Sequence, residues 1–212
     1  MELDLVLRRQ QQHLADIFTG LSDEQFKKNS LCSQFDVHLV LAHLVAQLST
    51  SSLKRGLTIA RSRRSRPQAQ LVLAQAAAQA SPRELLQRYE TLVKKDGKLS
   101  PKILIERLTD TTIHTVDVCR PLGLELPDMN FDFSPLLAFL ASDTALLEFV
   151  AAPLPNVTFV ASDAEWRAGR GPQVQGASLD LAMAMMARPN AARGLSGPGV
   201  ESVAQWARVH GR

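Results

Sequence analysis

The chain has 212 residues, of which 45% are hydrophobic and 21% are charged, and its formal net charge is +3. This composition is too apolar for a disordered chain, and the length suits one domain with or without a small appendage. The small positive excess does not by itself indicate a nucleic-acid partner.

The first three quarters of the chain predict a series of helices. Apolar residues recur at helical spacing in five stretches, which are about 2–19, 36–55, 82–95, 101–119 and 134–151. Asp36 is suited to cap the second of these helices, and Ser81 with Glu84 forms a capping-box pattern before the third. Short loops between the helices are typical of an up-and-down four-helix bundle, which we assign to residues 1–152.

Two segments complete the predicted bundle. The arginine-rich stretch 61–70 contains a proline and predicts a mobile connection, whereas the alanine-rich stretch 70–80 could extend a helix. Pro121 and Gly123 are expected to end the helix that begins near residue 101.

The pattern changes near residue 153. β-Branched and aromatic residues over 157–179 flank a glycine-rich turn at 169–171, and this arrangement predicts a β-hairpin. Helical patterns follow over 178–187 and 200–208. We therefore assign residues 153–212 to a small C-terminal α/β module, and we expect the fold class to be mainly α.

One predicted helix carries three polar residues, Asp110, His114 and Asp117, at helical spacing. Asp110 and His114 are four residues apart and project from one face, so both could reach the same metal ion. His43 is the best candidate for a third ligand because a buried imidazole needs a polar partner. Asp117 could orient His114 through the second ring nitrogen. The spacing alone is also compatible with a polar seam that faces solvent.

Three stretches of the sequence resemble the mycothiol-dependent maleylpyruvate isomerase family, within the wider DinB-like group of metal-binding helix bundles. They are LCSQFDVHLVLAHL at 31–44, DTTIHTVDVCRPLG at 110–123, and the segment 160–200. The first resembles the family's turn and its helix ending in His-Leu. The second resembles the family's acidic-x-x-x-His-x-x-Asp segment with its Arg-Pro-Leu-Gly ending. The third resembles the C-terminal hairpin-and-helix module.

Three positions depart from the family pattern. Phe35 stands where the family usually has tryptophan, His38 where it often has arginine, and Asp110 where it more often has glutamate. The resemblance implies His43, Asp110 and His114 as ligands of a divalent metal ion, and the ligand types favour zinc. It also implies a low-molecular-weight thiol, mycothiol, as a cosubstrate that attacks an unsaturated acid or another electrophile.

The resemblance assigns further roles in such an isomerase or S-transferase. Asp117 and Arg188 are the candidate catalytic residues, and Arg188 with Trp166 would bind the anionic cosubstrate. Arg188 could equally be a helix-terminal cation that faces the helix dipole. We expect the open side of the metal site to face a cleft between the bundle and the C-terminal module.

A second class of function stays open, namely a non-catalytic metal- or small-ligand-binding protein that retains the fold. The arginines at 61, 63, 64 and 66 could contact phosphates, but no aromatic residues interleave them, so we expect no nucleic-acid partner. We also expect no membrane association, because the sequence shows neither a signal peptide nor a membrane-spanning apolar run. The expected partners are a thiol and an electrophilic substrate, and the expected state is a cytoplasmic monomer or homodimer.

Overall fold

The computed structural model of the chain describes residues 2–50, 66–94, 97–145, 149–150 and 152–211. The described residues are mainly helical and include a three-stranded sheet near the C-terminus, which confirms the predicted fold class. The chain divides into two compact units, residues 1–129 and 130–212, which we call unit 1 and unit 2. The predicted domain boundary between residues 152 and 153 stays a prediction, because compactness does not show which part folds on its own.

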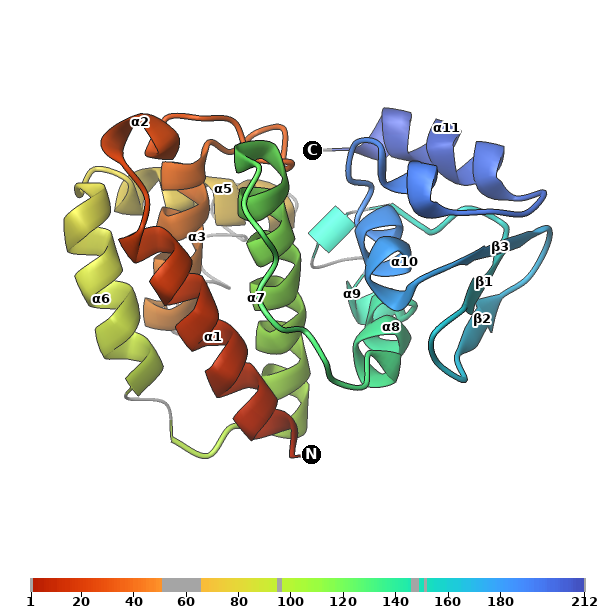
Figure 1. Ribbon diagram of the computed structural model, residues 1–212, viewed down its shortest axis with the longest axis horizontal. Coiled ribbons are helices and arrows are strands. Elements are labelled where there is room, and N and C mark those ends of the chain that lie inside the picture. The colour runs from red at the N-terminus through yellow and green to blue at the C-terminus, as the bar shows by residue number, and fades with distance from the viewer. Residues whose placement is uncertain (1, 51–65, 95–96, 146–148, 151, 212) are drawn as a thin grey trace. The chain divides into compact units, whose positions relative to one another are not determined.

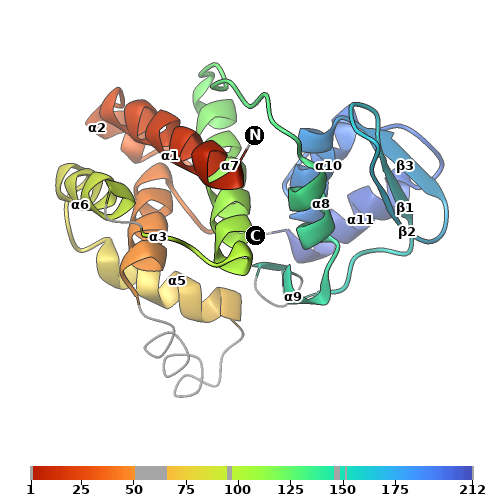
Figure 2. The same ribbon diagram turned by 90° about the horizontal axis from the view of Figure 1, so that it is seen from below.

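Unit 1 is a helical bundle. Its helices are α1 (Leu3–Thr19), α2 (Asp23–Phe26), α3 (Val37–Ser49), α5 (Arg66–Ala77), α6 (Pro82–Lys94) and α7 (Pro101–Leu122). Helix α3 packs against α5 and α6, and α1 packs against α7 and α6 (Figure 1). Figure 2 shows α5 crossing beside α3. The core between these helices includes Leu14, Phe18, Leu41, Leu85 and Tyr89, each at most 1% exposed.

Local signals in the sequence account for several helix ends in unit 1. The Leu39 N–H donates to Asp36 Oδ1 at 2.7 Å, which confirms the predicted cap of α3. The described part of the predicted helix 36–55 ends at Ser49, and residues 51–55 lie outside the described residues. The predicted connection 61–70 is wrong for residues 66–70, which form the start of α5. Pro67 is tolerated there because a first-turn N–H has no acceptor within the helix.

Helix α7 extends past the predicted end at residue 119. It continues through Pro121 to Leu122 and ends at Gly123, whose φ of 66° is in the left-handed region that favours glycine. Pro121 therefore lies inside the last turn instead of ending the helix. Because proline has no backbone N–H, the helix cannot use Pro121 to bond the carbonyl of Asp117.

Unit 2 contains short helices and the sheet. Its elements are α8 (Ser134–Leu140), α9 (Asp143–Ala145), β1 (Thr158–Ala161), β2 (Arg167–Gly169), β3 (Gln173–Gly176), α10 (Ser178–Met185), η2 (Ala191–Gly194) and α11 (Val200–His210). The prediction of one helix over 134–151 is wrong. Helix α8 ends at Leu140, and the Ser142 hydroxyl accepts a hydrogen bond from the Ala145 N–H to begin α9. Helix α10 packs against α8 and against β1 and β3.

The sheet differs from the predicted hairpin. Its strand order is β2-β1-β3, with β1 antiparallel to β2 and parallel to β3. The glycine-rich stretch 169–171 therefore carries the chain from one sheet edge to the other. Gly169 and Gly171 have φ angles of 90° and 114°, and a Cβ on Gly169 would lie 2.2 Å from the Val157 carbonyl oxygen. This close crossing, not a hairpin turn, requires the glycines.

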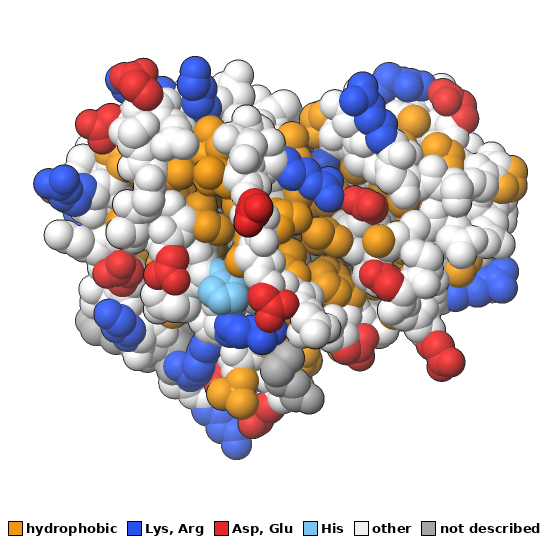
Figure 3. Space-filling model, viewed as in Figure 1, with side chains coloured by type: hydrophobic (Ala, Val, Ile, Leu, Met, Phe, Trp, Pro, Cys, Tyr) orange, Lys and Arg blue, Asp and Glu red, His pale blue; other side chains and the backbone are white. Residues whose placement is uncertain are grey.

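The distribution of surface charge and the lengths of the apolar helices bear on whether the chain binds nucleic acid or a membrane. On the face shown in Figure 3, lysine and arginine side chains are interspersed with carboxylates among the described residues. None of the described helices is long and apolar enough to span a membrane. The arginines at 61, 63 and 64 lie outside the described residues.

The start of α6 offers a test of the helix signals. The Ser81 N–H donates to Glu84 Oε2 at 2.8 Å, and the Glu84 N–H donates to Ser81 Oγ at 3.3 Å. Replacing Ser81 by alanine should lower the free energy of unfolding by about 1 kcal/mol, because the Glu84 N–H loses its acceptor and the Glu84 carboxylate loses the hydrogen bond from the Ser81 hydroxyl. Urea denaturation measures this change. Ser81→Thr, which keeps the hydroxyl, is the control, and equal stability of the alanine variant would contradict the capping box.

Candidate metal centre

Three buried side chains from two helices of unit 1 meet in one place. His43 comes from α3, and Asp110 and His114 come from α7. One ligand atom of each residue lies within 4.8 Å of those of the other two. The three residues are 4%, 6% and 5% exposed, respectively. The structure thus brings together the three residues that the spacing and the family resemblance had singled out.

Asp110 lies between the two imidazoles. Its Oδ1 atom is 3.4 Å from His43 Nε2 and 3.5 Å from His114 Nε2. The two rings meet edge to face, with their centroids 4.9 Å apart. The Nε2 atoms of both histidines therefore face the same carboxylate oxygen.

Asp117 determines which nitrogen of His114 is available. Its Oδ2 atom is 3.0 Å from His114 Nδ1, and Asp117 is fully buried. A carboxylate only accepts, so Nδ1 carries the hydrogen, and a neutral ring then has its lone pair on Nε2. This contact is the one expected if Asp117 orients His114 as a positioning residue, a role that stays a prediction.

The donor set fits a divalent cation. The imidazole nitrogens and the carboxylate oxygen are all electron-pair donors, and such donors repel one another in a buried site unless a proton or a metal ion lies among them. Two histidines and one carboxylate are also a common protein ligand set for catalytic zinc, which leaves a fourth position for another ligand. His43, Asp110 and His114 are therefore suited to hold a divalent ion.

The loop between α2 and α3, residues 27–36, places the ring of Phe35 beside both imidazoles. The Phe35 ring centroid lies 5.5 Å from that of His43 and 6.3 Å from that of His114. The loop is held by the Leu31 N–H, which donates to the Asp117 carbonyl at 3.0 Å. That carbonyl is available because Pro121 has no N–H to offer it. The proline in the last turn of α7 thus fixes the loop that packs against the candidate ligands.

Arg188 and Trp166 lie in unit 2, and their proposed binding roles stay predictions. Trp166 is half-buried between β1 and β2. Arg188 is buried, and its Nη1 donates to the Met186 carbonyl, at the C-terminal end of α10, at 3.3 Å. A cation in this position interacts favourably with the helix dipole, so the contact is the one expected if Arg188 has a structural role.

The two cysteines, Cys32 and Cys119, are buried. Burial raises the pKa of the Cys119 thiol to about 11, so this residue stays protonated and poorly nucleophilic at neutral pH. The sequence analysis missed Gln47, whose amide nitrogen lies 3.1 Å from His43 Nε2. Its position four residues after His43 could have identified it.

The chain resembles known proteins in its fold and not in its sequence. No family model and no curated protein matches the sequence. Among solved structures, the chain resembles the crystal structure of the mycothiol-dependent maleylpyruvate isomerase, with a TM-score of 0.61 and 15% sequence identity. A histidine-to-alanine mutant of that isomerase matches with a TM-score of 0.59 and 15% identity. Each match covers 93% of both chains. At this identity the likeness shows a shared fold.

The contact between Asp117 and His114 predicts how a substitution would act. Asp117→Asn should weaken the affinity for zinc by about 10- to 100-fold, because an amide can present a donor to Nδ1 and favour the wrong tautomer. Competition with a chelator measures the affinity. Asp36→Asn is the matched control in unit 1, since asparagine also caps a helix. Unchanged zinc affinity in Asp117→Asn would contradict the positioning role.

Proposed function

We propose that the chain is a divalent-metal-dependent enzyme of the mycothiol-dependent isomerase or S-transferase type, with zinc as the favoured ion. The buried group of His43, Asp110 and His114 carries this proposal. The fold likeness to the mycothiol-dependent maleylpyruvate isomerase supports it. The cosubstrate would be mycothiol or a similar small thiol, and the substrate an electrophilic or unsaturated acid.

Each residue of the centre has a distinct role in this proposal. A divalent ion held by His43, Asp110 and His114 would act as a Lewis acid and stabilise a thiolate near neutral pH. Asp117 would accept a hydrogen bond from Nδ1 of His114 and so direct the Nε2 lone pair of a neutral ring to the ion. Phe35 packs against both imidazoles and limits the access of water to them. The buried, protonated Cys119 leaves the role of nucleophile to an added thiol.

Arg188 and Trp166 are the proposed contacts of unit 2 with the anionic cosubstrate or substrate. Arginine and tryptophan suit a carboxylate-bearing ligand, since one pairs with the charge and the other offers an apolar face. This role requires that unit 2 reach the metal centre when the ligands bind. The cytoplasmic location and the monomeric or homodimeric state likewise stay predictions.

The second candidate function is a non-catalytic protein that binds a metal ion or a small ligand and retains the fold. The contact of Arg188 with the Met186 carbonyl favours it, because that contact gives the arginine a structural role. The two functions differ in one measurable outcome. The enzyme turns over an electrophile in the presence of a thiol, whereas the binding protein does not.

Removing one ligand tests the metal centre. His114→Ala should lose most of the bound zinc and all thiol-transfer activity, since two donors do not make a stable site. Elemental analysis of the purified variant, beside His43→Ala and wild type, measures the metal content. His38→Ala is the control because the His38 ring lies on α3 and contacts the Ala80 carbonyl instead of the candidate ligands. Full zinc occupancy in His114→Ala would refute the proposed ligand set.

Arg188→Ala separates the roles proposed for this residue. If Arg188 binds the anionic ligand, the variant should keep its zinc while KM for the thiol or the acid rises about tenfold or more. Maleylpyruvate and other unsaturated acids, assayed with mycothiol, supply the substrates. A loss of thermal stability with unchanged KM would instead assign Arg188 to the end of α10. Absence of turnover in the zinc-loaded wild type would favour the binding protein over the enzyme.

A further inference from the structure

Two helices of unit 1 each present a pair of polar side chains four residues apart. Helix α7 presents Asp110 and His114, and α3 presents His43 and Gln47. Residues at this spacing project from one face of a helix. Helices α3 and α7 pack against each other, and both pairs lie at the same point of contact. The geometry thus supplies a fourth polar side chain, Gln47, to a site with three candidate metal ligands.

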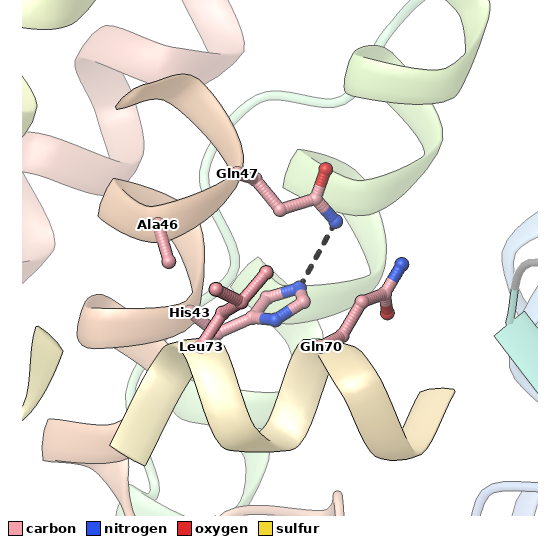
Figure 4. A pocket seen from close by; sticks show the side chains of 5 residues that line it. All are labelled: His43, Ala46, Gln47, Gln70 and Leu73. Carbon is pink, nitrogen blue, oxygen red and sulfur yellow. Dashed lines mark hydrogen bonds between the residues drawn. The ribbon is translucent and has the colours of Figure 1, made fainter. Parts of the chain in front are cut away.

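Gln47 lies beside the atom that would bind the ion. Its Nε2 is 3.1 Å from His43 Nε2, the same nitrogen that lies 3.4 Å from Asp110 Oδ1. Figure 4 shows the carboxamide of Gln47 directed at the His43 ring. The carboxamide has a donor nitrogen and an acceptor oxygen, and rotation about its last bond exchanges them. The carboxamide that contacts His43 can therefore present its oxygen to a cation at the same place.

The pocket around Gln47 contains uncharged groups. It is lined by His43, Ala46, Gln47, Gln70 and Leu73, from α3 and α5 (Figure 4). The space open to the centre of a water molecule is about 10 Å³, which is roughly one water. Gln47 also lines a second small pocket together with Asp110 and Arg107 of α7, so it lies beside candidate ligands from both helices.

We propose that Gln47 is the fourth, exchangeable donor of the metal centre. Its amide oxygen would hold the ion together with His43, Asp110 and His114, in the position that the sulfur of a thiol would take. A neutral amide oxygen is a weaker ligand for zinc than a thiolate, so the exchange favours the thiol. This inference rests on the proposed metal centre and adds a residue that selects sulfur over water.

Cobalt substitution tests the proposal. Co²⁺ is added to the metal-free protein, and its visible absorption reports the ligand number and geometry. Gln47→Ala should change this spectrum and weaken Co²⁺ affinity about tenfold, whereas Gln47→Glu should bind Co²⁺ more tightly. Gln70→Ala is the matched control, because Gln70 lines the same pocket from α5. It should leave the spectrum and the affinity unchanged.

A simple thiol, 2-mercaptoethanol, then probes the exchange. In Gln47→Ala, the sulfur band of the Co²⁺ protein should appear at a lower thiol concentration than in wild type, and in Gln47→Glu at a higher one. Circular dichroism confirms that each variant is folded. A Gln47→Ala protein with the wild-type spectrum, Co²⁺ affinity and thiol response would overturn the proposal while leaving the three-ligand centre intact. A wild type that binds no Co²⁺ would overturn both proposals.

Discussion

A buried carboxylate between two imidazole nitrogens is the interaction on which the rest of unit 1 depends. Asp110 Oδ1 lies within 3.5 Å of the Nε2 atoms of His43 and His114, and all three residues are almost excluded from solvent. Burying an ionised carboxylate is costly unless a cation compensates it. A metal ion would turn mutual repulsion into attraction. Binding of a metal ion at this place would therefore be thermodynamically linked to the packing of α3 against α7.

Helix α7 provides three of the residues around this centre within about two helical turns. Its side chains supply Asp110 and His114, and one turn later Asp117 fixes the ring of His114. The backbone of Asp117 has a second function because Pro121 leaves its carbonyl to the Leu31 N–H. Phe35 thereby reaches both imidazoles from an irregular loop. Pro121 would ordinarily weaken a helix, but here it leaves the Asp117 carbonyl to bond the loop that carries Phe35.

The bundle helices and the convergence of His43 with Asp110 and His114 could be predicted, because both follow from side-chain periodicity and from a family motif. The break at Ser142 and the strand crossing at 169–171 could not. The first depends on one hydroxyl that bonds the backbone locally, and the second on the close approach of Gly169 to the Val157 carbonyl. Neither interaction leaves a periodic signal. Gln47 was missed because a single glutamine in an apolar helix is usually a boundary residue.

The aspartate at position 110 places its carboxylate beside both histidines with a short side chain. Aspartate has one methylene fewer than the glutamate more usual in the resembled family, yet Asp110 Oδ1 stays within 3.5 Å of both histidine nitrogens. Packing between helices tolerates many apolar exchanges of similar volume, whereas donor atoms must keep their positions. This difference reconciles a shared fold at 15% identity with the absence of a family-model match. The fold requires apolar residues at helical spacing, whereas the site requires the donor atoms of His43, Asp110 and His114 at fixed positions.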